Sequence, residues 1–325
     1  MSYSLAATPA TLRLRADVLA RIRAFFATRG VLEVETPALS PAGVSDPALE
    51  SVTAQARSLG ERPLYLHTSP EYAMKRLLAS GSGDIYQLAR VFRDDELGRW
   101  HQPEFTLLEW YRVGWDEVAL MTEVELLLRD ALAADSAGER RPLAPGAVRI
   151  TYGDACVREL GLAPTSATPS LVAAIRDRGV DVPAGLSHDA VLDLAFSTLV
   201  VPGFAPGALT FVHDYPASQA ALARLKPGPP PVAARFEVFA RGIELANGFA
   251  ELTDAAEQRR RFELELDARR RAGRVAPPLD EELLAALERL PPCAGVAIGV
   301  DRLVALAASA DSVAAAMSFA HVRDA

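Results

Sequence analysis

The chain has 325 residues, of which 50% are hydrophobic and 23% are charged, a composition typical of a globular protein that buries a sizeable core. Its formal net charge of −8 argues against a protein whose main task is to wrap nucleic acid, because such proteins carry basic surfaces. Cys156 and Cys293 are too far apart in sequence for a metal-binding motif or a disulfide framework. No signal pattern or apolar stretch of about 18 residues is present, so we expect no membrane association and a cytoplasmic protein.

The first elements are predicted by helix-start signals and by periodicity. Thr8 and Pro9 open a helix as a hydroxyl cap followed by proline, and apolar residues recur at helical spacing until Gly30. Residues 31–37 alternate like a strand and end at a proline. Residues 64–68 are strand-like, and residues 70–79 predict a short helix.

Two long strands follow, over residues 84–92 and 105–113, joined by a polar loop as an antiparallel hairpin. Residues 116–133 predict a helix, and residues 134–149 predict a loop. Helices over 152–160, 169–178 and 187–199 form a small helical insertion at about 150–200.

The rest of the chain returns to strands and then to helices. The predicted strands cover 209–213, 233–239, 242–252 and 295–298, and the predicted helices cover 255–272, 281–290 and 301–308. This order favours an α+β fold, an antiparallel sheet flanked by helices, over a βαβ alternation. We expect a single catalytic domain over residues 1–325.

The hairpin carries the first chemistry-bearing segment, Arg93 within residues 90–96, followed by residues 101–109. An arginine after a strand presents a planar fork that binds phosphate or carboxylate and keeps its charge. The alternative is an ordinary strand-end arginine that pairs with Asp94 or Asp95. The second segment, residues 295–302, lends weight to the functional interpretation.

That second segment ends in Asp301 and Arg302 after an apolar strand. It is not a dinucleotide-binding loop, because such a loop has closely spaced glycines that open a helix early in a βαβ unit. Small residues here would let a flat nucleotide or a substrate lie against the strand, with Arg302 directed at a terminal phosphate. Both arginines follow strands, so we expect them to reach a common cleft.

A third segment, residues 244–251, contains Glu244, Asn247 and Glu251, which would line one cavity if the strand kinked at Gly248. Two carboxylates beside a triphosphate suit Mg²⁺, which prefers oxygen ligands, and one could instead pair with a substrate ammonium. The alternative is an exposed strand edge that carries acidic residues.

Three further features are weak by themselves. Glu71, after Ser69 and Pro70, could have the purely structural role of starting the helix over residues 70–79 and stabilising its dipole. Tyr111 is more often a core or interface aromatic than a ligand contact. The arginine runs 259–261 and 269–271 are expected to form a solvated helix face.

Taken together, these segments resemble the three signature motifs of a class II aminoacyl-tRNA synthetase catalytic core. Residues 30–37 resemble the first motif, residues 93–109 the second and residues 295–302 the third. Residues 69–71, 103–106 and 247–252 are similar to lysine-site segments of lysyl-tRNA synthetase. Lysyl-tRNA synthetases carry an N-terminal OB-fold domain that grips the anticodon, and we expect this protein to lack it, because the resemblance to the catalytic core begins at about residue 8.

The short form resembles the elongation factor P–(R)-β-lysine ligase family, a lysyl-tRNA synthetase paralogue. Residues 96–99, residues 109–112 and Ala297 in place of the middle glycine of the third motif are similar to that family. The resemblance implies an enzyme that adenylates (R)-β-lysine with ATP and Mg²⁺ and transfers it to a lysine side chain of elongation factor P. It also implies a homodimer built on residues 30–37 and no stable tRNA binding.

The resemblance implies a role for each motif residue. Arg93 and Arg302 would be catalytic, and ATP would be bound by Arg93, Asp94, Asp95, Gln102, Glu244, Leu245, Gly299 and Arg302. The substrate would be bound by Ser69, Pro70, Glu71, Tyr111, Asn247 and Glu251, and the metal by Glu244 and Glu251. Asp95 and Gln102 depart from the usual glutamate and asparagine, so the reach of Asp95 to the adenine is expected to be shorter.

Two other functions stay open at this point. One is a truncated lysyl-tRNA synthetase-like enzyme that forms lysyl-adenylate or charges tRNA. The other is a non-catalytic paralogue that binds an amino acid and regulates a partner, although such a protein would tolerate the loss of either motif arginine, and both are present.

Overall fold

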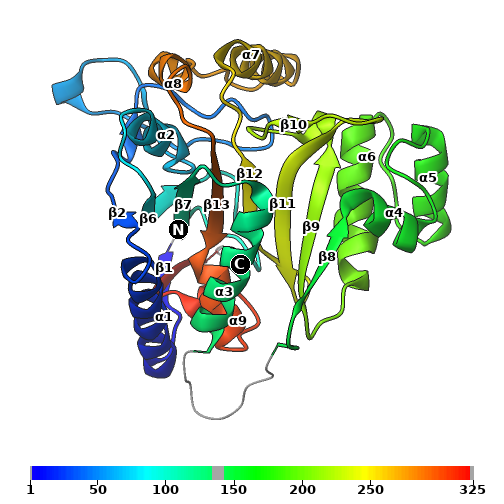
Figure 1. Ribbon diagram of the computed structural model, residues 1–325, viewed down its shortest axis with the longest axis horizontal. Helices are drawn as coiled ribbons and strands as arrows, with labels where there is room; N and C mark the ends of the chain where they lie inside the picture. The colour runs from blue at the N-terminus through cyan, green and yellow to red at the C-terminus, as the bar shows by residue number, and fades with distance from the viewer. Residues whose placement is uncertain (1, 134–142, 323–325) are drawn as a thin grey trace. The chain divides into compact units, whose positions relative to one another are not determined.

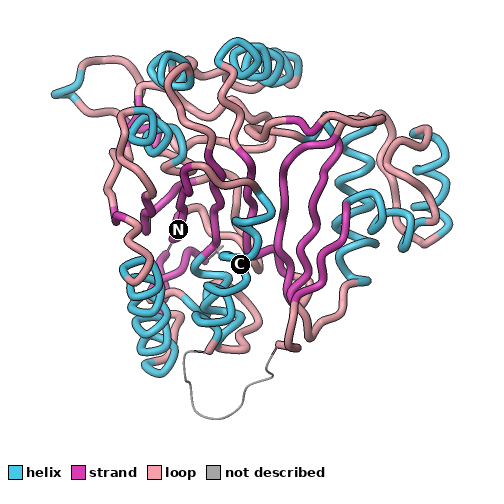
Figure 2. Tube along the Cα trace, in the orientation of Figure 1, coloured by secondary structure: helices cyan, strands magenta, loops and turns pink. Residues whose placement is uncertain are grey.

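The computed structural model describes residues 2–133 and 143–322, and the chain divides into two compact units. The first unit is Met1–Arg140 together with Glu251–Ala325, and the second is Arg141–Ala250. Figure 1 labels the elements of both units, and Figure 2 separates helices from strands. Each unit combines antiparallel strand pairs with helices, which confirms the expected α+β class.

The first unit contains four strands in the order β2 (Leu32–Glu33), β6 (Ile85–Phe92), β7 (Glu104–Val113) and β13 (Cys293–Gly299). β7 pairs antiparallel with both β6 and β13, so β6 and β13 run in the same direction and end at the same edge. The predicted hairpin is confirmed. The strand expected over 31–37 is shorter, because only β2 pairs with β6.

Helices cover one face of this sheet (Figure 1). They are α1 (Pro9–Ala27), which Thr8 caps as predicted, α3 (Glu117–Leu132) and α9 (Val300–Ala307). Side chains alternate between the faces of a strand, so alternate residues of β7 point toward these helices.

The even-numbered residues of β7 lie on the helix-covered face, among them Thr106, Trp110 and Arg112; Trp110 and Arg112 both donate hydrogen bonds to Glu123 of α3. The opposite face of β7 therefore carries the odd-numbered residues, including Glu109 and Tyr111. Both are buried.

The remaining elements of the first unit are short sheets and helices at its periphery. β1 (Ser2–Leu5) pairs with β14 (Phe319–Val322), and β5 (Leu64–Leu66) pairs with β3 (Leu39–Ser40) and β4 (Thr53–Ala54). The helices α2 (Glu71–Ala79), α7 (Ala255–Arg271) and α8 (Glu281–Leu287) pack on one another, and 3₁₀ turns cover Arg57–Leu59 and Ala314–Ala316.

The second unit has four strands in the order β12 (Ile243–Ala250), β11 (Val232–Ala240), β9 (Leu209–Pro216) and β8 (Ala147–Thr151), with β10 (Leu225–Lys226) on β11. α4 (Tyr152–Leu160), α5 (Thr168–Asp177) and α6 (His188–Ala195) form the predicted helical insertion (Figure 2). α6 continues through a π turn over Phe196–Val200 and a 3₁₀ turn over Val201–Gly203, and a further 3₁₀ turn covers Ala217–Gln219.

The loop predicted over 134–149 is partly wrong. Residues 134–142 lie outside the described residues, but 147–149 belong to β8, which pairs parallel with β9. The strand is half exposed and short, so no clear apolar alternation marked it in the sequence.

The arginine runs of α7 do not form a uniform solvated face. Arg269 is 1% exposed and donates hydrogen bonds to the backbone oxygens of Asp46, Leu49 and Val275 and to the carboxylate of Glu50. The prediction was wrong for this residue, because four acceptors from two loops converge on it. Among the described residues, no helix combines the length and hydropathy needed to cross a membrane.

Candidate active site

Arg93 and Arg302 both lie in the first unit, just beyond the ends of two strands that terminate at one edge. β6 ends at Phe92, opposite Glu104, and β13 ends at Gly299, opposite Leu107. Because both partners are at the beginning of β7, the two arginines leave the sheet at the same edge. This topology supports the expected common cleft, while the contacts of each side chain define its local setting.

Arg93 is held loosely. Its Nε donates to the backbone oxygen of Thr68 at 3.4 Å, its Nη1 lies 3.7 Å from the carboxylate of Glu96, and its guanidinium lies over the ring of Phe105. The ion pair with Glu96 takes the place of the alternative pairing with Asp94 or Asp95. The side chain is 25% exposed, so it remains accessible to a ligand anion.

Arg302 contacts the far end of the hairpin loop. Its Nε donates to the backbone oxygen of Trp100 at 3.1 Å, and its Nη2 lies 2.7 Å from Nε2 of His101. Gly299 lies beside the aliphatic part of Arg302, where an added Cβ would be 3.5 Å from Cδ. The two arginines therefore flank the loop of residues 94–103.

The other expected nucleotide residues of this loop have different environments. Asp94 and Asp95 are exposed, and the carboxylate of Asp94 accepts the backbone N–H of Asp95, whose φ is 61°. Gln102 is buried, and its side-chain amide binds both backbone groups of His321 in β14. The structure thus uses Gln102 to attach the hairpin loop to the C-terminal strand, and its contact with adenine stays a prediction.

A buried cluster of acidic side chains lies on the face of β7 away from the helices. Glu109 accepts hydrogen bonds from Ser69 and Tyr111, each at 2.6 Å. Lys75 of α2 bridges the other two carboxylates, with Nζ 2.7 Å from Glu71 and 2.6 Å from Glu251. We call Ser69, Glu71, Lys75, Glu109, Tyr111 and Glu251 the carboxylate cluster; its members come from the segment before α2, from α2, from β7 and from the residue after β12.

Burial dominates the protonation of this cluster. Burial and, second to it, the negative charge of Glu71 raise the pKa of Glu109 to about 8, against the opposing hydrogen bonds from Ser69 and Tyr111. Burial also raises the pKa of Glu251 to about 7, although Lys75 opposes this shift. Burial alone would lower the pKa of Lys75, but the carboxylates of Glu251 and Glu71 outweigh it, so the pKa rises and Lys75 stays charged. With Lys75 as its one cation, the cluster cannot ionise all three carboxyl groups without unpaired buried charge. An added cation would therefore be bound favourably.

Small residues of β13 make room for the cluster. Gly295 pairs with Tyr111, and a Cβ at this position would collide with the Tyr111 ring and lie 2.6 Å from Oε1 of Glu251. Ala297 pairs with Glu109 and packs against the apolar residues that lie further along the strands toward Arg93. These residues are Ala89, Val91, Leu107 and Phe105, and they form an apolar bed between the cluster and the arginines.

Pro70, the residue before α2, is buried, and it links Ser69 to Glu71. All the predicted substrate residues except Asn247 therefore meet in this cluster. Tyr111 is a contact of Glu109 and not a plain core aromatic, and Glu71 serves more than the helix dipole.

Glu244, Leu245 and Asn247 belong to the second unit. The β11–β12 register shifts between Val238 and Phe239, opposite Leu245, and this bulge brings Glu244 and Asn247 onto one face. The kink at Gly248 on which a shared cavity depended is not present, because Gly248 pairs regularly with Phe236. Leu245 is buried.

Asn247 and Glu244 sit beside a polar network of the second unit. Arg235 donates to Asn247 at 3.2 Å and to Glu237 at 2.6 Å, and Tyr215 donates to Glu237 at 2.7 Å. Burial, together with Glu244, raises the pKa of Glu237 against the opposing charge of Arg235. Arg235 and Glu237 thus fix the strand that carries the two predicted residues.

The acidic residues fit a magnesium ion only in part. Within the described parts of the chain, no group of three or more histidine, cysteine, aspartate or glutamate side chains forms a ready metal site. Glu251 is occupied by Lys75, whereas Glu244 is only half-buried. Mg²⁺ commonly binds through one or two carboxylates and completes its shell with phosphates and water, so Glu244 suits an ion that arrives with a nucleotide.

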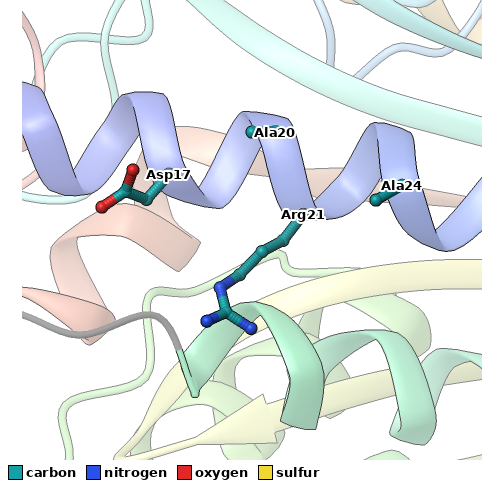
Figure 3. Close-up of a pocket in the computed structure, with 4 residues that line it drawn as sticks. All are labelled: Asp17, Ala20, Arg21 and Ala24. Atoms are coloured by element: carbon teal, nitrogen blue, oxygen red, sulfur yellow. The ribbon is translucent and has the colours of Figure 1, made fainter.

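One hollow on the surface of α1 lies apart from this chemistry. Asp17, Ala20, Arg21 and Ala24 line it, as Figure 3 shows. Arg21 forms a long ion pair of 3.6 Å with Asp130 of α3. The residues that line this hollow include no member of the carboxylate cluster and neither Arg93 nor Arg302.

Sequence reasoning did not identify Lys75 or Glu109 as site residues. Lys75 lies four residues after Glu71 on a predicted helix, a spacing that places the two on one helix face. Glu109 lies two residues before Tyr111 on a predicted strand, a spacing that places them on one strand face. Both spacings were available signals, but only the fold reveals that α2 and β7 meet at Glu251.

An antiparallel sheet with two strand-end arginines and a nearby cluster of carboxylates is what the class II synthetase resemblance predicts. Comparison with known proteins supports this resemblance. Residues 3–323 match the family described as tRNA synthetases class II (D, K and N). The chain belongs to this family. Its membership confirms the expected fold and the class II resemblance.

Several curated relatives are similar over almost their whole length. The chain is 45% identical over 329 residues to the elongation factor P–(R)-β-lysine ligase of Sodalis glossinidius, covering 99% of the chain and 98% of the relative. It is 46% identical to the enzyme of the same name from Edwardsiella ictaluri (98% and 97% covered) and 45% identical to that of Vibrio cholerae (96% and 95% covered).

Proposed function

We propose that this protein is an ATP-dependent ligase that adenylates (R)-β-lysine and transfers it to a lysine side chain of elongation factor P. The carboxylate cluster is the observation that carries the proposal, together with the names of the relatives. Its three carboxylates face one internal ammonium, so full ionisation leaves two negative charges. A lysine isomer carries two ammonium groups and one carboxylate, and these ammoniums match the excess charge.

The chemistry needs positioning and charge more than a protein nucleophile. A carboxylate oxygen of the amino acid attacks the α-phosphorus of ATP, and the bond to pyrophosphate breaks. Arg93 would reduce the repulsion between these two anions, and Arg302 would stabilise the charge on the leaving pyrophosphate. The apolar bed between Arg93 and Glu109 separates the two ends by a flat surface suited to the substrate chain.

In the second step, a neutral amine of elongation factor P attacks the adenylate carbonyl, and AMP leaves. The free amine of lysine has a pKa of about 10.4, so the acceptor must lose a proton before it attacks. Desolvation in the closed complex favours the neutral form. Magnesium, when bound with ATP, would neutralise phosphate charge, and Glu244 would hold it.

Mass spectrometry tests the proposal directly. Purified elongation factor P is incubated with this protein, ATP, Mg²⁺ and each lysine isomer in turn. The expected result is a mass increase of one lysyl group with (R)-β-lysine. Absence of the adduct with every isomer, while ATP is not consumed, would refute it.

A second candidate function is a lysyl-tRNA synthetase-like enzyme that charges tRNA or releases lysyl-adenylate, and the family match favours keeping it. The experiment separates the two when tRNA replaces elongation factor P: aminoacylated tRNA without modification of the protein supports the second candidate. A protein that binds the amino acid without consuming ATP would support a regulatory paralogue instead.

The protein is further proposed to act in the cytoplasm as a homodimer, without stable tRNA binding, with the subunit interface on residues 30–37. Light scattering at micromolar concentration tests the assembly, and a monomeric mass contradicts it.

A further inference from the structure

Arg15 of α1 reaches from the first helix to the last motif of the chain. Its side chain is 15% exposed, and its two terminal nitrogens bind different partners. Nη1 lies 2.6 Å from the carboxylate of Asp301, and Nη2 donates to the hydroxyl of Thr106 at 2.8 Å. Nη1 also donates to the backbone oxygen of Ala316 at 3.3 Å. One planar group thus joins α1, β7 and α9.

Asp301 closes this junction. Its other oxygen accepts the backbone N–H of Thr106 at 2.6 Å, and its side chain is 4% exposed. We call Arg15, Thr106 and Asp301 the α1 clamp. All three residues lie in the first unit and are buried or nearly buried, and the Thr106 hydroxyl also accepts a hydrogen bond from the more exposed Arg90 at 3.1 Å.

The clamp lies next to both motif arginines but touches neither proposed substrate end. Asp301 immediately precedes Arg302, and Thr106 immediately follows Phe105, over whose ring Arg93 lies. Thr106 is on the helix-covered face of β7, opposite the face of Glu109. Arg15 therefore acts on the site only through the elements that it joins.

Stability alone is a poor explanation of such a contact. A buried ion pair commonly contributes little net stability, because the desolvation of both charges offsets their attraction. What it does fix is geometry: the bidentate fork of arginine holds two acceptors at a set spacing. Here one acceptor, Asp301, precedes Arg302 in α9, and the other, Thr106, lies on β7, which pairs with the strand β6 that Arg93 follows.

We infer that Arg15 is a positioning residue for adenylation, one that keeps α9 in register with β7 so that Arg302 and Arg93 reach one triphosphate together. The inference rests on the proposed function of these two arginines. A misplacement of about 1 Å in such a site costs about a hundredfold in rate.

The test is ATP–pyrophosphate exchange by the full chain. Arg15→Met should lower kcat by about tenfold to a hundredfold, while KM for the amino acid stays near that of the unaltered protein, because the carboxylate cluster is remote from the clamp. Arg15→Lys, which keeps the charge but not the fork, should restore part of kcat. If Arg15→Met does not fold, Arg15→Lys and Asp301→Asn provide the same test.

The matched control is Arg112→Met. Arg112 also forms a buried ion pair on the helix-covered face of β7, with Glu123 at 2.6 Å, but toward the opposite end of the strand from Arg93 and Arg302. It should lower the melting temperature as Arg15→Met does, and leave kcat near that of the unaltered protein. A kcat that follows the melting temperature in both variants would overturn the inference.

A double-mutant cycle of Arg15→Met and Asp301→Asn completes the test. Coupled action predicts that the double variant loses little more kcat than the worse single variant, whereas multiplied losses would overturn the inference. Exchange by the unaltered protein reports on the proposed function and the ratio of variant to unaltered protein reports on the clamp, so the two failures are distinguishable.

Discussion

The charged side chains of the carboxylate cluster and the two motif arginines differ in burial and in how they are paired. The cluster is largely buried: Lys75 and Glu251 are each 1% exposed at the side chain and Glu71 is 13% exposed, whereas Arg93 is 25% exposed. The cluster is internally paired by Lys75 and partly neutralised by raised carboxyl pKa values. The arginines are held by backbone oxygens, a histidine and one long ion pair.

Under the proposed function, this difference would separate recognition from catalysis. The buried carboxylate cluster would select a cationic substrate before any reaction occurs, because unpaired charge in low dielectric is costly. An accessible pair of guanidinium groups can receive a triphosphate and follow the charge that moves to pyrophosphate. Changes at the arginine end should therefore alter rate, and changes at the acidic end should alter affinity, selectivity and stability.

The largest effect is expected at the arginine end. Arg302→Ala should leave the melting temperature nearly unchanged but lower ATP–pyrophosphate exchange by about two to three orders of magnitude, because it would remove the proposed charged contact with phosphate. Arg259→Ala is the control, since Arg259 lies on the surface of α7 and pairs with Glu281. Near-normal exchange by Arg302→Ala would contradict the assignment.

Gly295→Ala tests the packing of the acidic end. The added Cβ would collide with Tyr111 and approach Glu251, so we expect a loss of stability of about 1–3 kcal/mol and a raised KM for the amino acid. Gly207→Ala is a matched control, because nothing lies within 4 Å of its Cβ position. Chemical denaturation and steady-state exchange measure both effects, and an unchanged KM in Gly295→Ala would break the comparison.

The pH dependence of stability is a further test of the carboxylate cluster. The pKa of Glu109 is raised to about 8 in the folded state, so its contribution is fully present below the ordinary pKa of 4.5 and is lost as pH rises through about 8. Glu109→Gln should therefore reduce the fall in melting temperature between pH 5 and pH 8.5. Tyr111→Phe keeps the carboxyl group of Glu109 and should retain the fall in melting temperature. If the melting temperatures of the two variants fall equally with pH, the raised pKa does not belong to Glu109.

The smallest effect is expected at the bed between the two ends. Ala297→Gly removes one methyl group opposite Glu109, and should change the ratio of exchange rates with α- and β-lysine by about tenfold. Ala294→Gly is the control, because Ala294 is buried on the same strand but pairs with Arg112 on the helix-covered face, and it should leave the ratio unchanged. An unaltered ratio in Ala297→Gly would show that this position does not border the substrate.

Most elements were predictable because their signals are local. The proline-initiated helix α1, the β6–β7 hairpin and α4 follow from caps, alternation and apolar spacing. The positions of Arg93 and Arg302 at strand ends followed from the same patterns. The α+β class needed no more than the order of these elements.

The site was less predictable, because its contacts join segments that are distant in sequence. Lys75 meets Glu251 across 176 positions (251 − 75), and no local pattern encodes that contact. Arg269 was expected on a solvated face, since composition cannot reveal that loop oxygens from residues 46–49 surround it. The bulge opposite Leu245 likewise arises from pairing with β11, and the assignments of Glu244 and Asn247 stay predictions.

The bond between Gln102 and His321 has a consequence for synthesis on the ribosome. β14 follows every other element of the first unit in the chain, including the segments that carry the carboxylate cluster. The hairpin loop can therefore be attached to β14 only after those elements have been synthesised.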